Sequence, residues 1–210
     1  MKSINVANLV IILGLALRSV VNVNAQEDQP SASQTDAAQS VDPNSQNPYG
    51  PYQFLVGDWN VASDENEPAV AVQRFRWGPN HSYIWFAGSL LFNDEEKPHF
   101  EGILMWNGVH KNLDMLVAMD LESGLVQEQG TVSIQSDGTV VREITATYSA
   151  GARPIGAPVA GPSGLVMHFR QTFKAIEPGK IVTTVMRQSD HGWVATFPGS
   201  DHMIMTRRPG

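Results

Sequence analysis

Residues 125–148 read LVQEQGTVSIQSDGTVVREITATY, and this stretch indicates a β-hairpin. Apolar and polar residues alternate with a period of two on both sides of Ser136-Asp137-Gly138, which is typical of two half-buried strands joined by a turn. If these three residues form the loop with Gly138 in the left-handed conformation, Ile134 lies opposite Val140. A two-residue loop would mix apolar and polar residues on each face. The burial pattern therefore favours the three-residue loop.

With this register, one face of the hairpin is mainly apolar and is expected to point into the core. That face carries Val126, Glu128, Gly130, Val132, Ile134, Val140, Arg142, Ile144, Ala146 and Tyr148. The same alternation in residues 165–173 adds Met167 and Gln171 to the inward set. A buried polar group without a partner costs about 1–3 kcal/mol. Glu128, Arg142 and Gln171 are therefore the inward positions that require an explanation.

The chain around this hairpin repeats its pattern of short apolar runs rich in Val, Ile, Thr and aromatic residues, separated by turns. Short connectors predict antiparallel neighbours, and about ten strands without an interior proline are expected to close and remove their edges. The fold class predicted is all-β: an antiparallel up-and-down, lipocalin-like barrel of about ten strands. The expected strands are Gly57–Ala62, Val70–Trp77, Ser82–Gly88, His99–Trp106, Asn112–Met119, Leu125–Gln135, Thr139–Ala150, Leu165–Ile176, Lys180–Arg187, Trp193–Phe197 and His202–Arg208.

Two connections are longer than the others, Ser89–Pro98 and Gly151–Ser163. Strand alternation places both at the same end of the barrel. Long loops are typical of the open mouth of a barrel, so we expect a ligand to enter there.

The first fifty residues differ in composition from the rest. Residues 1–25 carry Lys2, an apolar run from Val6 to Leu17 and a small residue at Ala25, which is typical of a cleaved secretory signal peptide. A transmembrane anchor is the alternative, but Arg18 interrupts the run well before the roughly 20 residues that a span needs. Residues 26–50 are acidic and poor in aliphatic residues, so a disordered linker is predicted. The barrel domain is then 51–210, and the protein is expected to be secreted or periplasmic.

Composition excludes several classes of function. The 210 residues contain no cysteine, which excludes disulfides, thiolate metal sites and thiol catalysis. The formal net charge of −7 disfavours nucleic acid and anionic membranes as partners. No phosphate-binding glycine loop, Gly-x-Ser-x-Gly elbow or His-Glu-x-x-His motif is present in the sequence. No cofactor is expected.

Phe54-Leu55-Val56-Gly57-Asp58-Trp59 opens the first expected strand, and Met203-Ile204-Met205-Thr206-Arg207-Arg208 forms the last. This pair of segments resembles the lipocalin-like, or calycin, barrels, and within them an uncharacterised secreted bacterial branch. The resemblance implies a barrel with a central ligand cavity. It also implies that Trp59 packs at the closed base beneath Arg207 or Arg208. It implies no catalytic residue.

We therefore expect a secreted or periplasmic protein that binds a small, largely apolar molecule in the barrel cavity. The candidate ligand-binding residues are Glu128, Arg142, Gln171, Tyr148 and Met167. A polar network that only fixes strand register explains the same inward residues equally well. The alternative function is an enzyme of the lyase or isomerase type, with Glu128 as general base and Arg142 as electrophilic stabiliser.

A metal or paired-carboxylate site is a further alternative, formed by His99, Glu101 and Glu128. If 107–111 is a five-residue loop, Glu101 lies opposite Val117 and the three side chains share one interior row. If Asn107-Gly108 is a two-residue turn, the residues facing inward are instead Phe100, Gly102, Leu104 and Trp106. The Asn-Gly dipeptide favours this second register.

Overall fold

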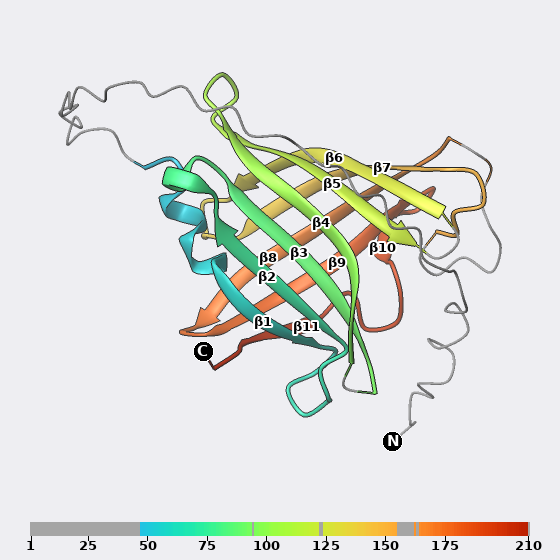
Figure 1. Ribbon diagram of the computed structural model, residues 1–210, viewed down its shortest axis with the longest axis horizontal. Coiled ribbons are helices and arrows are strands. Elements are labelled where there is room, and N and C mark those ends of the chain that lie inside the picture. Colours follow the sequence, from blue (N-terminus) through green and yellow to red (C-terminus); the bar gives the residue numbers. More distant parts are fainter. Residues whose placement is uncertain (1–46, 94, 122–123, 155–161, 163, 210) are drawn as a thin grey trace, which may run out of the picture. The chain divides into compact units, whose positions relative to one another are not determined.

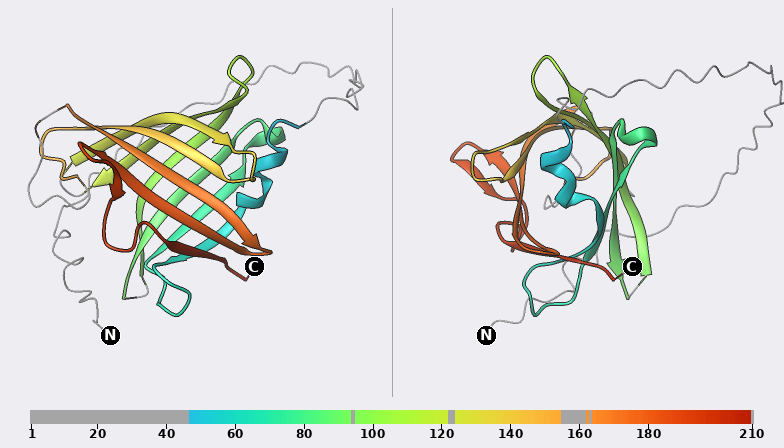
Figure 2. Two further views of the ribbon diagram at one scale, coloured as in Figure 1. Left: turned by 180° about the vertical axis from the view of Figure 1, so that it is seen from behind. Right: turned by 90° about the vertical axis from the view of Figure 1, so that its left-hand side faces the viewer.

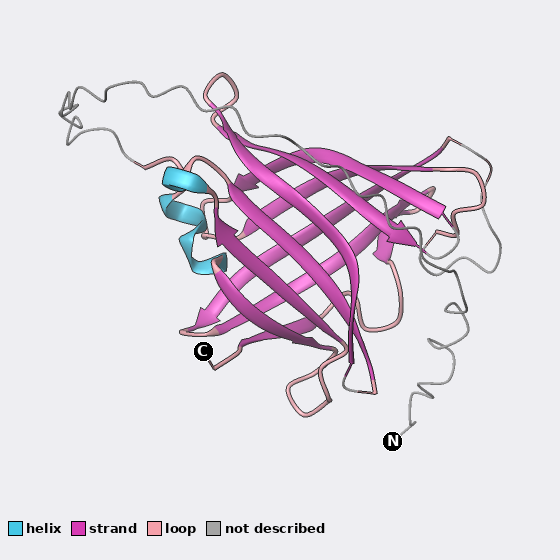
Figure 3. Ribbon diagram, in the orientation of Figure 1, coloured by secondary structure: helices cyan, strands magenta, loops and turns pink. Residues whose placement is uncertain are grey.

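The computed structural model describes residues 47–93, 95–121, 124–154, 162 and 164–209. Its folded unit begins at Pro48 and is almost entirely antiparallel sheet (Figure 3). The strands are β1 (Gly57–Ala62), β2 (Ala71–Trp77), β3 (Ile84–Phe92), β4 (Glu95–Asn107), β5 (Asn112–Leu121), β6 (Gly124–Ile134), β7 (Val140–Tyr148), β8 (Leu165–Glu177), β9 (Lys180–Ser189), β10 (Gly192–Ala195) and β11 (Met203–Arg207). Two short 3-10 segments, η3 (Gly50–Leu55) and η4 (Pro79–His81), complete the described elements.

The sheet closes into a barrel. Strands β1 to β9 pair in chain order, and β11 lies between β9 and β1 (Figure 1). Ten strands therefore form the closed ring, as the alternation predicted. Strand β10 is additional: it pairs with residues 186–189 of β9, beyond the residues 180–183 that pair with β11. Within the described residues, no helix is long and apolar enough to span a bilayer.

The hairpin of β6 and β7 has the predicted register. Ile134 lies opposite Val140 and Val132 lies opposite Arg142. Gly138 has φ +81°, the left-handed conformation that the three-residue loop requires. The face expected to point inward is buried except at Ile134, which lies at the end of its strand and is 39% exposed, and at Glu128 and Gly130, which are partly buried.

The predicted long connection Ser89–Pro98 is wrong. Strand β3 continues to Phe92 and β4 begins at Glu95, so this segment is a continuation of the hairpin. The register shifts after Gly88, and Pro98 lies opposite Ser89 next to this shift. A proline is tolerated at such an irregularity, where a ladder hydrogen bond is already missing. Because the strands were expected to contain no interior proline, the prediction ended β3 too early and began β4 too late.

The base of the barrel is closed around Trp59, which is 1% exposed. The Arg207 guanidinium lies 4.5 Å from the centre of the Trp59 ring and donates hydrogen bonds to the carbonyls of Val56 and Phe54 at 3.0 and 3.3 Å. A Cβ atom at residue 57 would lie 2.1 Å from Arg207 Nη1, so this contact requires Gly57. Seen along the barrel, η3 lies at this end within the ring of strands (Figure 2).

Aromatic side chains fill the barrel above this base. Phe75 stacks on Phe86 with 5.8 Å between ring centres and meets Phe173 edge-on at 6.1 Å. Each of the three is at most 1% exposed. They come from β2, β3 and β8, so the contacts cross the interior. The base half of the barrel is thus a packed core.

The folded unit begins three residues before the expected boundary at residue 51. Tyr49 is 5% exposed, donates a hydrogen bond to the Ser82 carbonyl at 2.7 Å and accepts one from the Trp106 amide at 2.9 Å. Its ring therefore belongs to the core. The expected signal peptide, and all of the expected linker before residue 47, lie outside the described residues.

Candidate functional site

Arg142 on β7 is a buried cation at the centre of the barrel. Its side chain points inward, is 4% exposed and lies 4.7 Å from the centre of the Phe86 ring across the interior. Nη1 donates to Gln171 Oε1 at 2.8 Å, while Nε and Nη2 contact Met115 Sδ at 3.1 and 2.8 Å. Burial lowers the Arg142 pKa to about 10, and the charge of Glu128 opposes that shift. The guanidinium is therefore held by neutral groups.

The polar contacts continue from Arg142 onto the next strands. Gln171 lies directly opposite Arg142 in the sheet, and its Nε2 is 3.5 Å from Oγ1 of Thr183, which has no exposed surface. We call Met115, Arg142, Gln171 and Thr183 the polar bridge. It spans β5, β7, β8 and β9 above the packed aromatic rings.

A glycine on the strand between β5 and β7 leaves room for this bridge. Gly130 on β6 lies opposite Met115 on one side and Ile144 on the other, so a side chain there would stand between Met115 and Arg142. The backbone of strand β7 also lies close to Gly130. A Cβ at residue 130 would lie 1.8 Å from the carbonyl oxygen of Glu143.

Glu128 on β6 is the carboxylate of the interior. It lies opposite Val117 and Ala146, as predicted, and its side chain is half-buried. Burial raises its pKa, with the nearby Arg142 charge acting in the opposite direction. Within the described part of the chain, the structure gives its carboxylate no hydrogen bond or ion pair. The Tyr148 pKa is raised to about 12, mainly by burial and further by the Glu128 charge.

The mouth half of the interior holds both buried and partly exposed inward side chains, and Met119, Val126 and Tyr148 there are at most 7% exposed. Inward side chains that pack on the core but keep exposed surface are Phe100, Leu165, Met167 and Val185. Two inward polar residues also keep exposed surface, and the sequence analysis did not include them in the inward set. Arg187 on β9 lies opposite Phe169, and Gln73 on β2 has a buried amide oxygen without a partner among the described residues. Strand alternation from Ile181 or from Phe75 would have identified both.

The structure does not bring the alternative metal set together. Glu101 lies opposite Ala118, on the exposed outer face, whereas Glu128 points inward. The register with a five-residue loop is therefore wrong. Asn107 pairs with Asn112 across four residues, so the two-residue turn is also wrong. Its inward set is nevertheless kept for Gly102 and Leu104, which are buried, and for Phe100, which packs on the core, whereas Trp106 is 36% exposed. The side chain of Asn107 accepts hydrogen bonds from the amides of residues 109 and 110, which stabilises the longer turn.

His99 is partly buried, and this burial lowers its pKa. The charge of Asp120 opposes the shift. Among the residues that the structure describes, no group of three His, Asp or Glu side chains is arranged to hold a metal ion.

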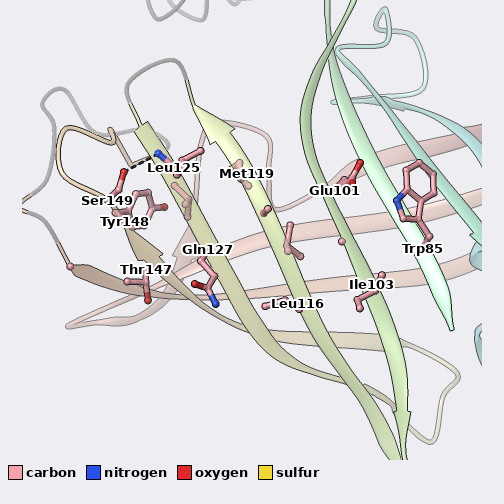
Figure 4. A pocket seen from close by; sticks show the side chains of 15 residues that line it. Trp85, Glu101, Ile103, Leu116, Met119, Leu125, Gln127, Thr147, Tyr148 and Ser149 are labelled. Carbon is pink, nitrogen blue, oxygen red and sulfur yellow. Dashed lines mark hydrogen bonds between the residues drawn. The ribbon is translucent and has the colours of Figure 1, made fainter. Parts of the chain in front are cut away.

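A groove of about 740 Å³ lies on the outer face of strands β3 to β7. Trp85, Ile103 and Leu116 follow one another in a single register row there. Figure 4 shows Trp85 and Glu101 at one side of the groove and Leu125 and Ser149 at the other, with the hydrogen bond from the Leu125 amide to Ser149 Oγ drawn as a dashed line. Its outward side chains, such as Trp85 and Leu116, point away from the polar bridge. Its lining also includes residues of the inward set, Val117, Met119, Val126 and Tyr148, so the groove and the expected interior site share four residues of the sheet.

Comparisons with known proteins show no family. No protein-family model matches the chain, and no curated protein matches it by sequence. A crystal structure of Rv2717c from M. tuberculosis is 13% identical over 78% of this chain and 99% of that chain, with a TM-score of 0.45. A likeness at this level establishes neither a shared family nor a shared function.

Proposed function

We propose that the protein binds a small, largely apolar molecule in the mouth half of the barrel interior. The observation that carries this proposal is that some inward side chains of the mouth half keep exposed surface. The base is sealed by rings at most 1% exposed, whereas Met167, Phe100 and Glu128 point inward and still keep exposed surface. Binding sites of this kind combine apolar walls with a few polar groups that orient the ligand.

The polar bridge forms the floor of the proposed site. Arg142 and Gln171 lie between the packed rings and the mouth, so a ligand that enters from the mouth meets polar atoms at its deepest point. The walls above are Val117, Met119, Val126 and Met167. The flexible thioethers of the two methionines adapt to different apolar shapes. We further infer that the protein acts after export, in a secreted or periplasmic location, because residues 1–25 have the pattern of a signal peptide.

The test introduces a bulky side chain on the inner or on the outer face of strand β8. Met167→Trp fills the interior, while Val166→Trp changes the adjacent residue, which points outward and is 50% exposed. Fluorescence titration with N-phenyl-1-naphthylamine, an uncharged apolar probe, is expected to give at least about tenfold weaker binding for Met167→Trp only.

A third variant separates the interior from the outer groove. Leu116→Arg places a charge in the groove at a side chain that is 47% exposed. Probe binding is expected to be unchanged. Loss of binding in Leu116→Arg with full binding in Met167→Trp would move the ligand to the outer groove and overturn the proposal.

A second candidate function is an enzyme that transfers a proton within the same site. It is favoured by Glu128, a carboxyl group with a raised pKa that interacts with the Arg142 charge, since a base and a cation at one site suit proton abstraction. The compound found by screening would be incubated with the protein and examined by mass spectrometry and NMR. Conversion that Glu128→Gln abolishes while affinity is kept would favour the enzyme. An unchanged compound would favour simple binding.

A further inference from the structure

We propose that the outer groove is a second binding site, whose ligand is an amphipathic cation: an apolar molecule with one ammonium group. The groove has a volume of about 740 Å³, which is typical of a site for a small molecule. Its described lining contains one aromatic ring on the outer face, Trp85, and one charged side chain, Glu101. This inference goes beyond the proposed function, because the ligand would lie against outward side chains and not inside the barrel.

The first step concerns the surface of the groove. Ala118 on β5 lies between Glu101 on β4 and Gln127 on β6, so a methyl group separates two longer side chains. Leu116 precedes Ala118 by two residues on the same face, and Leu125 on the next strand is 63% exposed. Exposed apolar side chains around a hollow are typical of a surface that binds a partner.

The second step concerns charge. Residues 99–148 contain two Lys or Arg residues, and neither lies on the outer face: Lys111 is in the turn before β5, and Arg142 points inward. Glu101 is exposed, and within the described residues the structure gives it no ion pair. The outer face of β5 adds Asp114 and Asp120. A cationic group is therefore the electrostatic complement of this face.

The third step concerns the position of Trp85. Trp85 pairs with Ile103, so Glu101 is its diagonal neighbour on β4, at about 7 Å in an antiparallel sheet. Figure 4 shows Trp85 and Glu101 on adjacent strands at one side of the groove. An ammonium group is attracted by a carboxylate and by the face of an indole ring. The cationic end of the ligand is therefore expected at Glu101 and Trp85, with its apolar end towards Leu125.

Arg76 on β2 lies directly opposite Trp85, and its charge would oppose a cationic ligand if it were not balanced. Arg76 forms an ion pair with Asp58 on the neighbouring strand β1. This pair is neutral overall, so the carboxylate of Glu101 determines the charge at this side of the groove.

A second copy of this chain is the alternative occupant of an apolar sheet face. A two-fold interface brings identical surfaces together, so Glu101 and the two aspartates of β5 would lie near their own counterparts. Like charges at an interface oppose association, and the formal net charge of −7 adds to the repulsion. Charge therefore favours a cationic ligand over a copy of the chain.

The width of the groove determines the choice of probe. Glu101 and Leu125 lie two strands apart, on β4 and β6, which is about 10 Å at about 4.8 Å per strand. An extended decyl chain has a similar length. Decyltrimethylammonium is therefore a suitable cation, and 1-decanol and decanoate carry the same chain with a neutral and a negative end.

The experiment titrates the three probes into the full folded protein by calorimetry, at concentrations below those at which they form micelles. The interior is first saturated with N-phenyl-1-naphthylamine, and Met167→Trp gives an independent measurement with the interior filled. The protein is expected to bind decyltrimethylammonium at least about fivefold more tightly than 1-decanol, and to bind decanoate least tightly.

Two matched variants test the role of Glu101. Glu101→Gln is expected to remove the preference for the cation. Glu95→Gln changes the net charge equally at an exposed carboxylate of the same strand outside the groove, and is expected to keep the preference. Leu116→Arg is expected to weaken binding of decyltrimethylammonium at least about tenfold, because it adds a like charge to the apolar wall. Folding of each variant is checked by circular dichroism.

The outcomes separate this site from the proposed function. Equal affinity for the cation and the alcohol, or a preference that survives in Glu101→Gln or is lost equally in Glu95→Gln, would overturn the cation site. A dimer in analytical ultracentrifugation that Leu116→Arg abolishes, without binding of the cation, would assign the groove to a second copy and also overturn it. Failure of N-phenyl-1-naphthylamine to bind, with the cation bound as expected, would overturn the proposed function and leave this site standing.

Discussion

Replacing Trp59 with alanine tests how the barrel is closed. The side chain is 1% exposed, and removal of a large buried aromatic residue costs about 3–5 kcal/mol. The substitution also removes the hydrogen bond from Trp59 Nε1 to the Leu55 carbonyl at 2.7 Å and the contact with Arg207. These losses add about 1 kcal/mol. The expected total is at the upper end of the range, about 4–5 kcal/mol.

The measurement is urea unfolding followed by far-UV circular dichroism, because the variant lacks a tryptophan and fluorescence would not be comparable. For a domain of this size, the expected loss corresponds to a fall in Tm of roughly 8–20 °C. Trp85→Ala is the matched control, since this tryptophan lies on the outer face and keeps exposed surface; its expected cost is about 1 kcal/mol or less. A loss for Trp59→Ala no larger than that of the control would refute the closed base.

Three further predictions concern the interior and the chain start. Arg142→Met leaves Gln171 Oε1 without its donor and should cost about 1–3 kcal/mol in urea unfolding; an unchanged midpoint would mean that the polar bridge does not stabilise the fold. Glu128 has its folded-state pKa raised above 4.5, so wild-type stability is full below that pH and falls as pH rises through the folded pKa. Glu128→Gln should lack this fall, and parallel unfolding curves for both proteins up to about pH 8 would contradict it. Limited proteolysis should remove residues 26–47 and leave a core that begins near Pro48; protection of that stretch would exclude a disordered linker.

Much of the fold could be predicted because strand pairing in this chain is local. The Ser136-Asp137-Gly138 turn and the alternation around it determine one register, and the structure has that register from Ile134 to Tyr148. The same alternation places Gln171 on the inward face with Arg142, and a pairing of Met119 with Val126 places Glu128 opposite Val117, as the structure has it. Each of these statements needs only a turn type and a period of two.

The errors lie where local patterns compete. Asn107-Gly108 is typical of a two-residue turn, but a four-residue turn forms because Asn107 satisfies two loop amides with its side chain. Pro98 reads as a strand breaker, but the register shift beside Ser89 accommodates it. In both cases, the outcome depends on how the hairpin packs on its neighbours. Local sequence does not contain that information.

The partners of Arg142 show a second kind of limit. Sequence places Arg142 inside the barrel and suggests Glu128 as its counter-charge, but the guanidinium instead contacts Met115 and Phe86, from strands two and four positions away around the ring. These contacts depend on the barrel diameter and on the open position at Gly130, which only the closed structure specifies.

The position of Arg142 links the stability of the barrel to its proposed site. On one side the guanidinium covers the Phe86 ring, and this ring stacks on Phe75 in the sealed base. On the other side it interacts with Glu128, whose half-buried carboxyl group faces the mouth half. A ligand in the mouth half that contacts Arg142 would therefore add to the stability of the packed half as well, since a ligand that binds only the folded state raises the free energy of unfolding. Added N-phenyl-1-naphthylamine should consequently raise the Tm of wild type, and should raise it less in Arg142→Met.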